Sequence, residues 1–275
     1  MTSIKNDLKN LIAENNRHTD TFQRNLLKEH LQILVLDFIY SHPKYSELIF
    51  YGGSCLAHCF GLQRLSEDLD FVDLRNKIKL AKLAKDLENY FNQSTDLPIK
   101  ITVQKFRLYL KFPILKELDL AKGNDSDFLF LKVEIFQKFN FCAKYQTEII
   151  PLFKADKSIL IKTFDLPTLM ATKIRAILNR IWEKTDKTGR IIAVVKGRDY
   201  FDLMWYLEKK IKPNFDCLEI KNLAELKAKL LKKVNMLDEK SIQYDLEALI
   251  DNIDFVKKLS RNIKDILKRE IQKYK

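Results

Sequence analysis

The most constraining stretch of the sequence spans residues 50–73 and reads FYGGSCLAHCFGLQRLSEDLDFVD. An apolar run ends in the triplet at 52–54, a short helical segment follows at 55–60, and the chain returns with Leu69 and Phe71 alternating with aspartates. This order of apolar runs, glycines and alternation predicts a strand, a glycine turn, a helix and a second strand.

Gly52, Gly53 and Ser54 are candidate phosphate-binding residues. Glycines at a strand end let the backbone approach a phosphate closely, and the N–H groups at the start of the next helix add a positive dipole end. Asp68 and Asp70 lie two residues apart on the expected strand and therefore project from the same side. Such an oxygen pair suits a hard divalent ion such as Mg²⁺. A phosphate cradle facing two carboxylates predicts two-metal phosphoryl or nucleotidyl transfer.

The net charge of the chain indicates its partners, and its apolar runs indicate its location. A net charge of +12 in 275 residues favours a polyanionic partner, most simply nucleic acid, and the alternative is a set of well-solvated surface lysines. No apolar run approaches the roughly 20 residues of a membrane span, and the polar start of the sequence lacks an apolar signal core. We therefore expect a cytoplasmic protein with no membrane partner.

The rest of the chain predicts an α+β fold with helices on both sides of the central stretch. Helices are expected at 4–16, 21–40, 77–91, 168–182, from about 198, at 219–234 and at 241–273, and strands at 99–106, 108–112, 128–136, 151–153 and 159–164. This arrangement predicts a mixed-sheet catalytic domain with its N-terminal helices over residues 1–155. A helical, basic domain is expected over residues 156–275.

Two further groups of residues have alternative interpretations. Glu134 lies among alternating apolar residues, where a carboxylate is costly unless it is paired or metal-bound; the alternative is an edge-strand charge that faces solvent. Cys55 and Cys59 lie one turn apart on the expected helix, with His58 beside them. Too few ligands are suitably spaced for a metal site, which favours small buried thiols.

The string GGSCL at 52–56, followed by RLSEDLDF at 64–71, resembles the signature of the AbiEii/AbiGii toxin family, which includes MenT-like members. This family belongs to the nucleotidyltransferase superfamily of DNA polymerase beta. Lys173 in KIRA, and the helix start RDYFDL at 198–203, are similar to two further family motifs. The resemblance covers roughly residues 45–207.

The resemblance implies a nucleotidyltransferase sheet domain followed by a helical domain, with the active site in a cleft between them. Asp68 and Asp70 would hold two Mg²⁺ ions, or Mn²⁺, and Glu134 would be the third acidic ligand, on the ion that activates the acceptor hydroxyl. Lys173 would neutralise charge on the triphosphate, a task that suits a point charge on a flexible stem.

The remaining site residues also follow from the resemblance. Arg64 and Ser66 would brace the glycine turn or contact phosphate, and Arg198 would contribute to nucleotide binding. One of Asp199 and Asp202 would be needed for activity, but the two share a helix face, so periodicity does not choose between them. The alternative is that these carboxylates cap the start of the helix.

The implied function is that of a toxin from a toxin–antitoxin or phage-defence (abortive infection) system. It would transfer a nucleotide from an NTP to RNA, with the 3′ end of tRNA as the expected acceptor, and a cognate antitoxin would restrain it. Two alternatives are transfer to a hydroxyl of a protein or small molecule, and a non-catalytic nucleic-acid-binding module with a decayed site. The presence of both aspartates and the glycines argues against decay.

Overall fold

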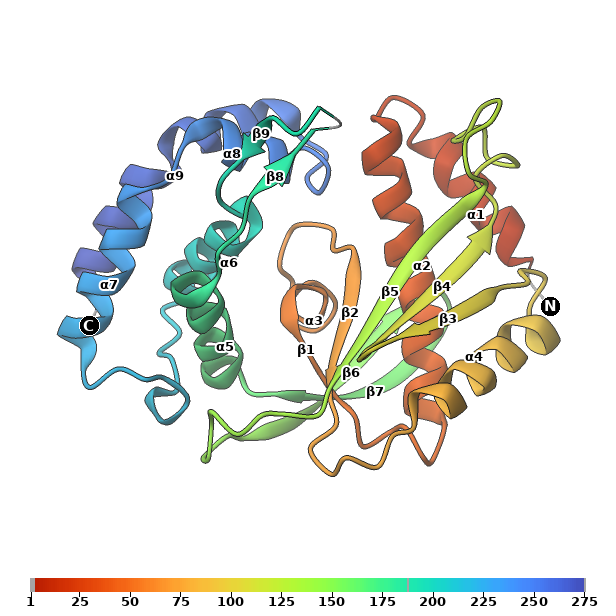
Figure 1. Ribbon diagram of the computed structural model, residues 1–275, viewed down its shortest axis with the longest axis horizontal. Helices are drawn as coiled ribbons and strands as arrows, with labels where there is room; N and C mark the ends of the chain where they lie inside the picture. The colour runs from red at the N-terminus through yellow and green to blue at the C-terminus, as the bar shows by residue number, and fades with distance from the viewer. Residues whose placement is uncertain (1–2, 187, 275) are drawn as a thin grey trace. The chain divides into compact units, whose positions relative to one another are not determined.

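The computed structural model describes residues 3–186 and 188–274 and divides into two compact units (Figure 1). Unit 1 comprises the residues up to Phe139 together with Thr147–Thr163. Unit 2 comprises Asn140–Gln146 and the residues from Phe164 onward. The predicted α+β class is confirmed, because a mixed sheet and helices account for most of the described residues.

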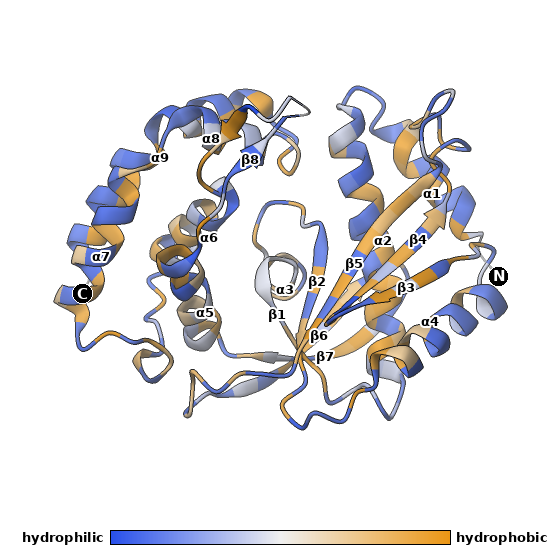
Figure 2. Cartoon of the chain, viewed as in Figure 1, coloured by the Kyte–Doolittle hydropathy of each residue, from blue (hydrophilic) through white to orange (hydrophobic). Residues whose placement is uncertain are grey.

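A seven-stranded sheet with the strand order β3-β4-β5-β2-β1-β7-β6 organises unit 1. Its strands are β1 (Ile49–Tyr51), β2 (Asp68–Val72), β3 (Lys100–Gln104), β4 (Arg107–Pro113), β5 (Phe128–Phe136), β6 (Thr147–Lys154) and β7 (Lys157–Phe164). Strand β2 pairs antiparallel with β1 and parallel with β5, so it lies in the interior of the sheet. Figure 2 shows that β5 is largely hydrophobic, as expected of an interior strand.

Four helices of unit 1 lie among the described residues: α1 (Ile4–Glu14), α2 (Asp20–Ser41), α3 (Gly52–Phe60) and α4 (Leu80–Ser94). Helix α2 begins after Thr19, whose side chain accepts a hydrogen bond from the N–H of Phe22. Leu27, Leu31 and Leu34 of α2 are buried at helical spacing, and each such side chain contributes roughly 1.5–3 kcal/mol by leaving water. Helices α2 and α4 run alongside β3, β4 and β5 (Figure 1).

The Gly-Gly-Ser segment at 52–54 differs in one respect from the prediction. Gly52, Gly53 and Ser54 form the first turn of α3 rather than a turn that precedes it. Gly52 has φ +84°, a left-handed conformation that glycine adopts without the strain of a side chain. The N-cap residue, Tyr51, makes no side-chain capping bond. The helix therefore starts directly at the end of β1 and without a side-chain cap.

Unit 2 is mainly helical, with α5 (Leu166–Asn179), α6 (Gly197–Glu208), the 3₁₀ turn η1 (Phe215–Cys217), α7 (Leu223–Asn235), α8 (Glu239–Leu246) and α9 (Ile253–Lys273). The polar linker predicted after α5 forms a short hairpin of β8 (Lys184–Thr185) and β9 (Ile191–Ala193). The single helix predicted at 241–273 is wrong. The chain breaks after α8, and Asn252 caps α9 by accepting a hydrogen bond from the N–H of Phe255.

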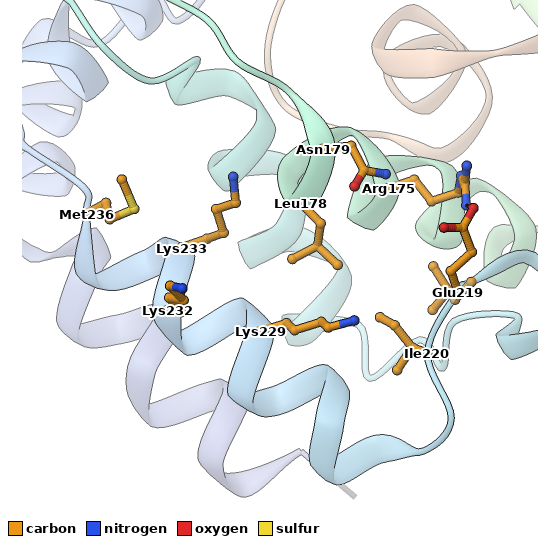
Figure 3. Close-up of a pocket in the computed structure, with 10 residues that line it drawn as sticks. Arg175, Leu178, Asn179, Glu219, Ile220, Lys229, Lys232, Lys233 and Met236 are labelled. Atoms are coloured by element: carbon orange, nitrogen blue, oxygen red, sulfur yellow. Dashed lines mark hydrogen bonds and ion pairs between the residues drawn. The ribbon is translucent and has the colours of Figure 1, made fainter.

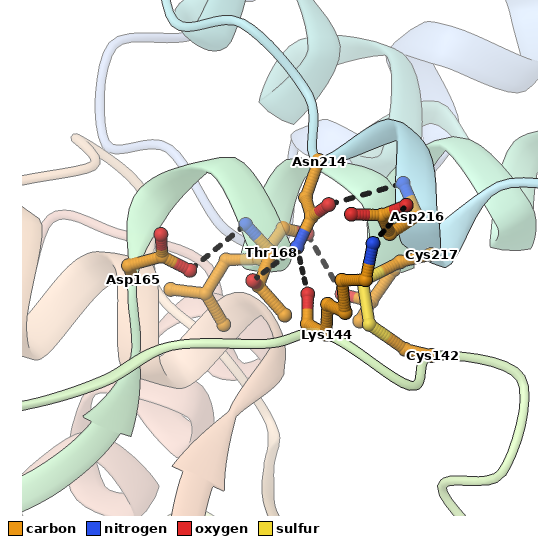
Figure 4. The surroundings of a disulfide bond; sticks show 9 residues. Cys142, Lys144, Asp165, Thr168, Asn214, Asp216 and Cys217 are labelled. Carbon is orange, nitrogen blue, oxygen red and sulfur yellow. Dashed lines mark hydrogen bonds and ion pairs between the residues drawn. A yellow bond between two sulfur atoms is a disulfide. The ribbon is translucent and has the colours of Figure 1, made fainter.

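A disulfide between Cys142 and Cys217 joins the 140–146 segment to η1 within unit 2 (Figure 4). Beside it, the side-chain amide of Asn214 donates to the carbonyl of Lys144 at 2.6 Å, and the N–H of Asn214 donates to the carbonyl of Pro167. The segment is thus fixed to the helices by both a covalent bond and hydrogen bonds. Within the described residues, no helix has the length and apolar character needed to cross a bilayer.

Candidate functional site

The predicted carboxylates lie on two adjacent strands of unit 1. Strands β2 and β5 pair in parallel, with Asp70 opposite Glu134 and Asp68 opposite Lys132. Because residues two apart on a strand and directly paired residues share a face of the sheet, all four side chains project from the same face. The structure therefore places on one face of the sheet the three acidic residues that the sequence singled out.

Basic side chains neutralise this acidic face. The ammonium of Lys132 lies 2.9 Å from Asp68 Oδ2 and 2.9 Å from Glu134 Oε1, and Arg107 Nε lies 2.8 Å from the same Glu134 oxygen. Glu134 is buried and belongs to an interior strand, so the alternative of an edge-strand carboxylate facing solvent is wrong. Lys132 and Arg107 were not predicted as site residues, because their roles depend on strand register.

The three carboxylates are candidate ligands for a divalent cation. Within residues 3–186 and 188–274, no three His, Cys, Asp or Glu side chains converge closely enough to enclose a metal ion. The oxygen donors of Asp68, Asp70 and Glu134 are nevertheless the type that Mg²⁺ prefers. The ammonium of Lys132 between two of them shows that a positive charge is favoured there. The chemistry of these donors therefore suits a divalent ion, and in this structure the Lys132 ammonium holds the position between Asp68 and Glu134.

The glycine turn lies directly against the carboxylate strand. A Cβ placed on Gly52 would lie 2.6 Å from Asp70 Oδ2, and one placed on Gly53 would collide with the guanidinium of Arg64. Ser54 is fully buried, and its hydroxyl has no hydrogen-bond partner among the described residues. The absence of side chains at 52 and 53 thus lets the start of α3 approach both Asp70 and Arg64.

A buried hydrogen-bond chain braces the loop that precedes Asp68. The ring Nε2 of His58 donates to Gln32 Oε1 at 2.9 Å, and Gln32 Nε2 donates to the carbonyl of Ser66 at 2.8 Å. Arg64 Nη1 donates to the carbonyl of Leu65 at 2.8 Å. Arg64 and Ser66 are both buried and take part in holding this loop. Gln32 is a further positioning residue, which its place within α2 did not reveal.

We expect the stability of the protein to fall on mild acidification because of His58. Burial lowers the pKa of His58 to about 3, with Lys154 adding to the effect. The unfolded chain, with a histidine pKa of about 6.5, binds a proton that the folded chain excludes, so this contribution is lost as the pH falls from about 6.5 towards 3. The free energy of unfolding should drop by roughly 2–3 kcal/mol between pH 7 and pH 4.5 from this group alone.

Urea denaturation of the wild type and of His58→Gln at both pH values measures this contribution. The glutamine keeps a donor towards Gln32 but does not titrate. An equal pH dependence in the two proteins would show that His58 is not the group responsible.

In unit 2, the predicted lysine and aspartates form a buried ion-pair network. Lys173 Nζ lies 2.9 Å from Asp199 Oδ1 and 2.7 Å from Asp202 Oδ2, and Arg180 pairs with the other oxygen of Asp199. Burial raises the pKa of Asp199, but Lys173 and Arg180 outweigh it, and the pKa lies below its ordinary value. Both aspartates are therefore placed to hold Lys173, and Arg180 is a partner that the sequence did not reveal.

Arg198 makes contacts that fix the start of α6. Its N–H donates to Asp245 Oδ2 at 2.8 Å, and its Nη2 donates to Asp245 Oδ1 at 3.0 Å. Gly197 lies so close to α8 that an added Cβ would be 3.0 Å from the backbone of Ile242. These contacts dock α6 on α8. The predicted role of Arg198 in nucleotide binding stays a prediction, as does the cleft predicted between the two domains.

Comparisons with known proteins find one matching family and several similar solved structures. A family model described as nucleotidyl transferase AbiEii toxin of a type IV toxin–antitoxin system matches residues 36–273. The crystal structure of JHP933 from Helicobacter pylori is 17% identical and covers 90% of this chain and 94% of its own, with a TM-score of 0.47. A provisionally assigned nucleotidyltransferase from H. pylori is also 17% identical and covers 91% and 97%, with a TM-score of 0.48. No curated protein matches the chain.

Proposed function

We propose a function for this chain from its membership of the AbiEii family of nucleotidyl transferase toxins of type IV toxin–antitoxin systems. In this proposal the chain transfers a nucleotide from an NTP to RNA, and the acceptor is the 3′ end of tRNA. The family match confirms the resemblance drawn from residues 45–207 and extends it to residues 36–273. It also confirms that the chain is a nucleotidyltransferase. The RNA acceptor, the metal ions and the cytoplasmic location belong to the proposal.

One observation carries the catalytic part of the proposal. The first turn of α3 and the carboxylate strand β2 meet at Gly52 and Asp70, where only the missing side chain of Gly52 leaves room. The N–H groups of a helix start favour an anion, and the carboxylates of β2 favour a cation. Their contact supports a single site that takes a triphosphate together with its metal ions.

The residues of unit 1 then have distinct tasks. Gly52, Gly53 and Ser54 would hold phosphate oxygens through the N–H groups of the first turn of α3. Asp68 and Asp70 would bind two Mg²⁺ ions, and Glu134 would be the third acidic ligand. When bound, such ions supply Lewis-acid stabilisation of the charge that develops on the phosphoryl oxygens.

Lys173 would neutralise charge on the triphosphate. The reaction is attack by an acceptor hydroxyl on the α-phosphate of the NTP, which forms an acceptor–phosphate bond and releases pyrophosphate. Asp199 and Asp202 hold the Lys173 ammonium in place, so a single role serves both aspartates. The net charge of +12 supports a polyanionic acceptor, and membership of a toxin–antitoxin family supports a cognate antitoxin as the partner that restrains activity.

The test is an acceptor-labelling assay. Purified protein, MgCl₂ and total RNA are incubated with each of the four labelled NTPs in turn, beside the double variant Asp68→Ala/Asp70→Ala. We expect label in tRNA-sized RNA with the wild type only. Label in protein, or none in RNA, would overturn the RNA acceptor and favour a protein or small-molecule hydroxyl, which cell lysate in place of RNA would reveal.

We expect Lys132→Met to increase the effect of Mg²⁺ on stability. Without its ammonium, the carboxylates of Asp68 and Glu134 repel one another more strongly and gain more from a divalent cation. Thermal unfolding should therefore show a lower Tm than the wild type without MgCl₂ and a larger rise in Tm when it is added. Lys100→Met, on the exposed strand β3, removes the same charge elsewhere. A Mg²⁺-induced shift in Lys132→Met no larger than that of the wild type would count against a metal site here.

A further inference from the structure

One face of helix α7 carries a row of basic residues that the proposed catalytic reaction does not use. Lys229, Lys232 and Lys233 recur at intervals of three and four and so share a face of the helix. The C-cap residue Met236 continues this side, which spans about 10 Å. The residues that anchor α7 in the core, including Leu230 and Val234, lie on another side. The lysines are therefore not needed to pack the helix.

This face lines a pocket within unit 2. Figure 3 shows Lys229 and Lys233 projecting from α7, with Arg175, Leu178 and Asn179 on α5 across from them. The pocket has a volume of about 390 Å³.

Most of the charge on the pocket wall is positive and only partly paired. Arg175 is engaged, because it pairs with Glu219 at 2.9 Å and covers the ring of Phe141. Lys229 pairs with Glu225. Within the described part of the chain, neither Lys232 nor Lys233 lies within ion-pair distance of a carboxylate. The pocket therefore presents two cations without a counter-charge.

A second pocket of about 290 Å³ adjoins the first, because Lys233 and Met236 line both. Its other lining residues include the cations Arg180 and Lys196 and the aromatic Trp182 and Tyr200. Its carboxylates are Asp199 and the exposed Glu183, and Asp199 is already paired to Lys173 and Arg180. The two pockets share Lys233 and Met236 on their walls and are together called the groove, which carries both cations and aromatic surface.

Lys196 is the most unusual group in the second pocket. It is half-buried, and no carboxylate of the described residues lies within ion-pair distance of it. Burial and the neighbouring Arg198 lower the pKa of Lys196 to about 8, although Asp199 acts in the opposite direction. An anion placed beside this ammonium would relieve the cost of burying it.

We propose that this groove, defined by Lys232 and Lys233 on α7 and by Lys196 and Trp182 in the adjoining pocket, binds successive phosphates of single-stranded RNA. Lysines are point charges that pair with phosphates without reading sequence, and aromatic rings beside them stack on bases. A chain of phosphates fits two pockets that share a lysine better than one compact triphosphate does. The inference rests on the proposed function and deepens it, because it assigns the surface that holds the RNA acceptor.

The test measures RNA binding by the full-length protein without NTP or MgCl₂. A short fluorescein-labelled single-stranded RNA is titrated with the wild type, with Lys232→Gln/Lys233→Gln, and with Lys257→Gln/Lys258→Gln. The last variant removes the same charge from adjacent exposed lysines of α9, outside both pockets. Lys196→Gln tests the second pocket separately, and the Tm of each variant reports folding.

For the groove variant we expect roughly tenfold weaker binding, and a decrease of about 1.4 in the slope of log affinity against log salt. The α9 variant should stay within about twofold of the wild type. Equal losses in the two double variants would show a diffuse charge effect and would overturn the groove, as would wild-type binding by the groove variant. Tighter binding of polyglutamate than of RNA would indicate an acidic protein partner instead and would also overturn it.

The two proposals fail in different ways. If RNA binding depended on the groove but no label were transferred to RNA, RNA would be rejected as the acceptor. The groove would still be an RNA-binding site. If the groove variant transferred label to RNA at the wild-type rate, at RNA concentrations below saturation, the groove would be rejected as the RNA site. The proposed transferase activity would stand.

Discussion

Asp68→Asn is expected to reduce nucleotide transfer by roughly 10³-fold, because it removes a charge from the carboxylate pair that would bind the metal ions and so weakens stabilisation of the transition state. The side chain of Asp68 is 31% exposed and pairs with Lys132, which keeps Glu134 as a partner after the substitution. The fold should therefore persist, and the Tm should change little. Initial rates of label transfer at saturating NTP and MgCl₂ measure the effect.

Glu67→Gln is the matched control for this variant. It removes a carboxylate from the adjacent position, where Glu67 forms a long ion pair of 3.9 Å with Lys28. Its rate should stay within a few-fold of the wild type. If Asp68→Asn retained more than a tenth of the wild-type rate, Asp68 would not be a metal ligand and the assignment of β2 as the catalytic strand would fail.

Lys173→Met is expected to lower the free energy of unfolding by roughly 3–5 kcal/mol, the usual cost of leaving a buried charge without its partner. Lys173, Asp199 and Asp202 have side chains that are only 12%, 5% and 0% exposed. Arg180 still neutralises Asp199 in the variant, whereas Asp202 loses the ammonium of Lys173. Urea denaturation at neutral pH measures the change.

A double variant separates this structural effect from catalysis. Lys173→Met/Asp202→Leu removes the buried carboxylate together with its partner and should recover much of the lost stability, but not the transferase activity. If Lys173→Met unfolded at the wild-type urea concentration, the network would contribute nothing to stability. Lys173 would then be held in place only for the substrate.

Local signals in the sequence predicted the strand, the helix and the second strand within residues 50–73. The glycines of α3 and the alternating aspartates of β2 are adjacent in the chain, and their meaning depends on backbone conformation and strand periodicity alone. Strand β5 has the predicted bounds of 128–136 because its apolar run is flanked by polar residues on both sides.

Features that depend on tertiary contacts could not be predicted in this way. Lys132 was visible only as a basic residue in an apolar strand, and its contact with Asp68 follows from the parallel register of β2 and β5. Arg180 reaches Asp199 from the end of α5, and the Cys142–Cys217 bridge joins residues 75 apart. The break between α8 and α9 contains neither glycine nor proline, and Asn252 was its one local signal.

The division of the chain into units restricts what genetic dissection can reveal. Unit 2 includes the 140–146 segment, which in the sequence follows strand β5 and precedes strand β6 of unit 1. A disulfide joins Cys142 of this segment to Cys217. A gene fragment that begins at codon 164 would encode the helices without this segment, and one that stops at codon 163 would encode the sheet with the segment but without its attachment. Loss of toxicity in nested deletions would therefore report misfolding at both ends of the gene, and point substitutions are the better means of mapping function in this protein.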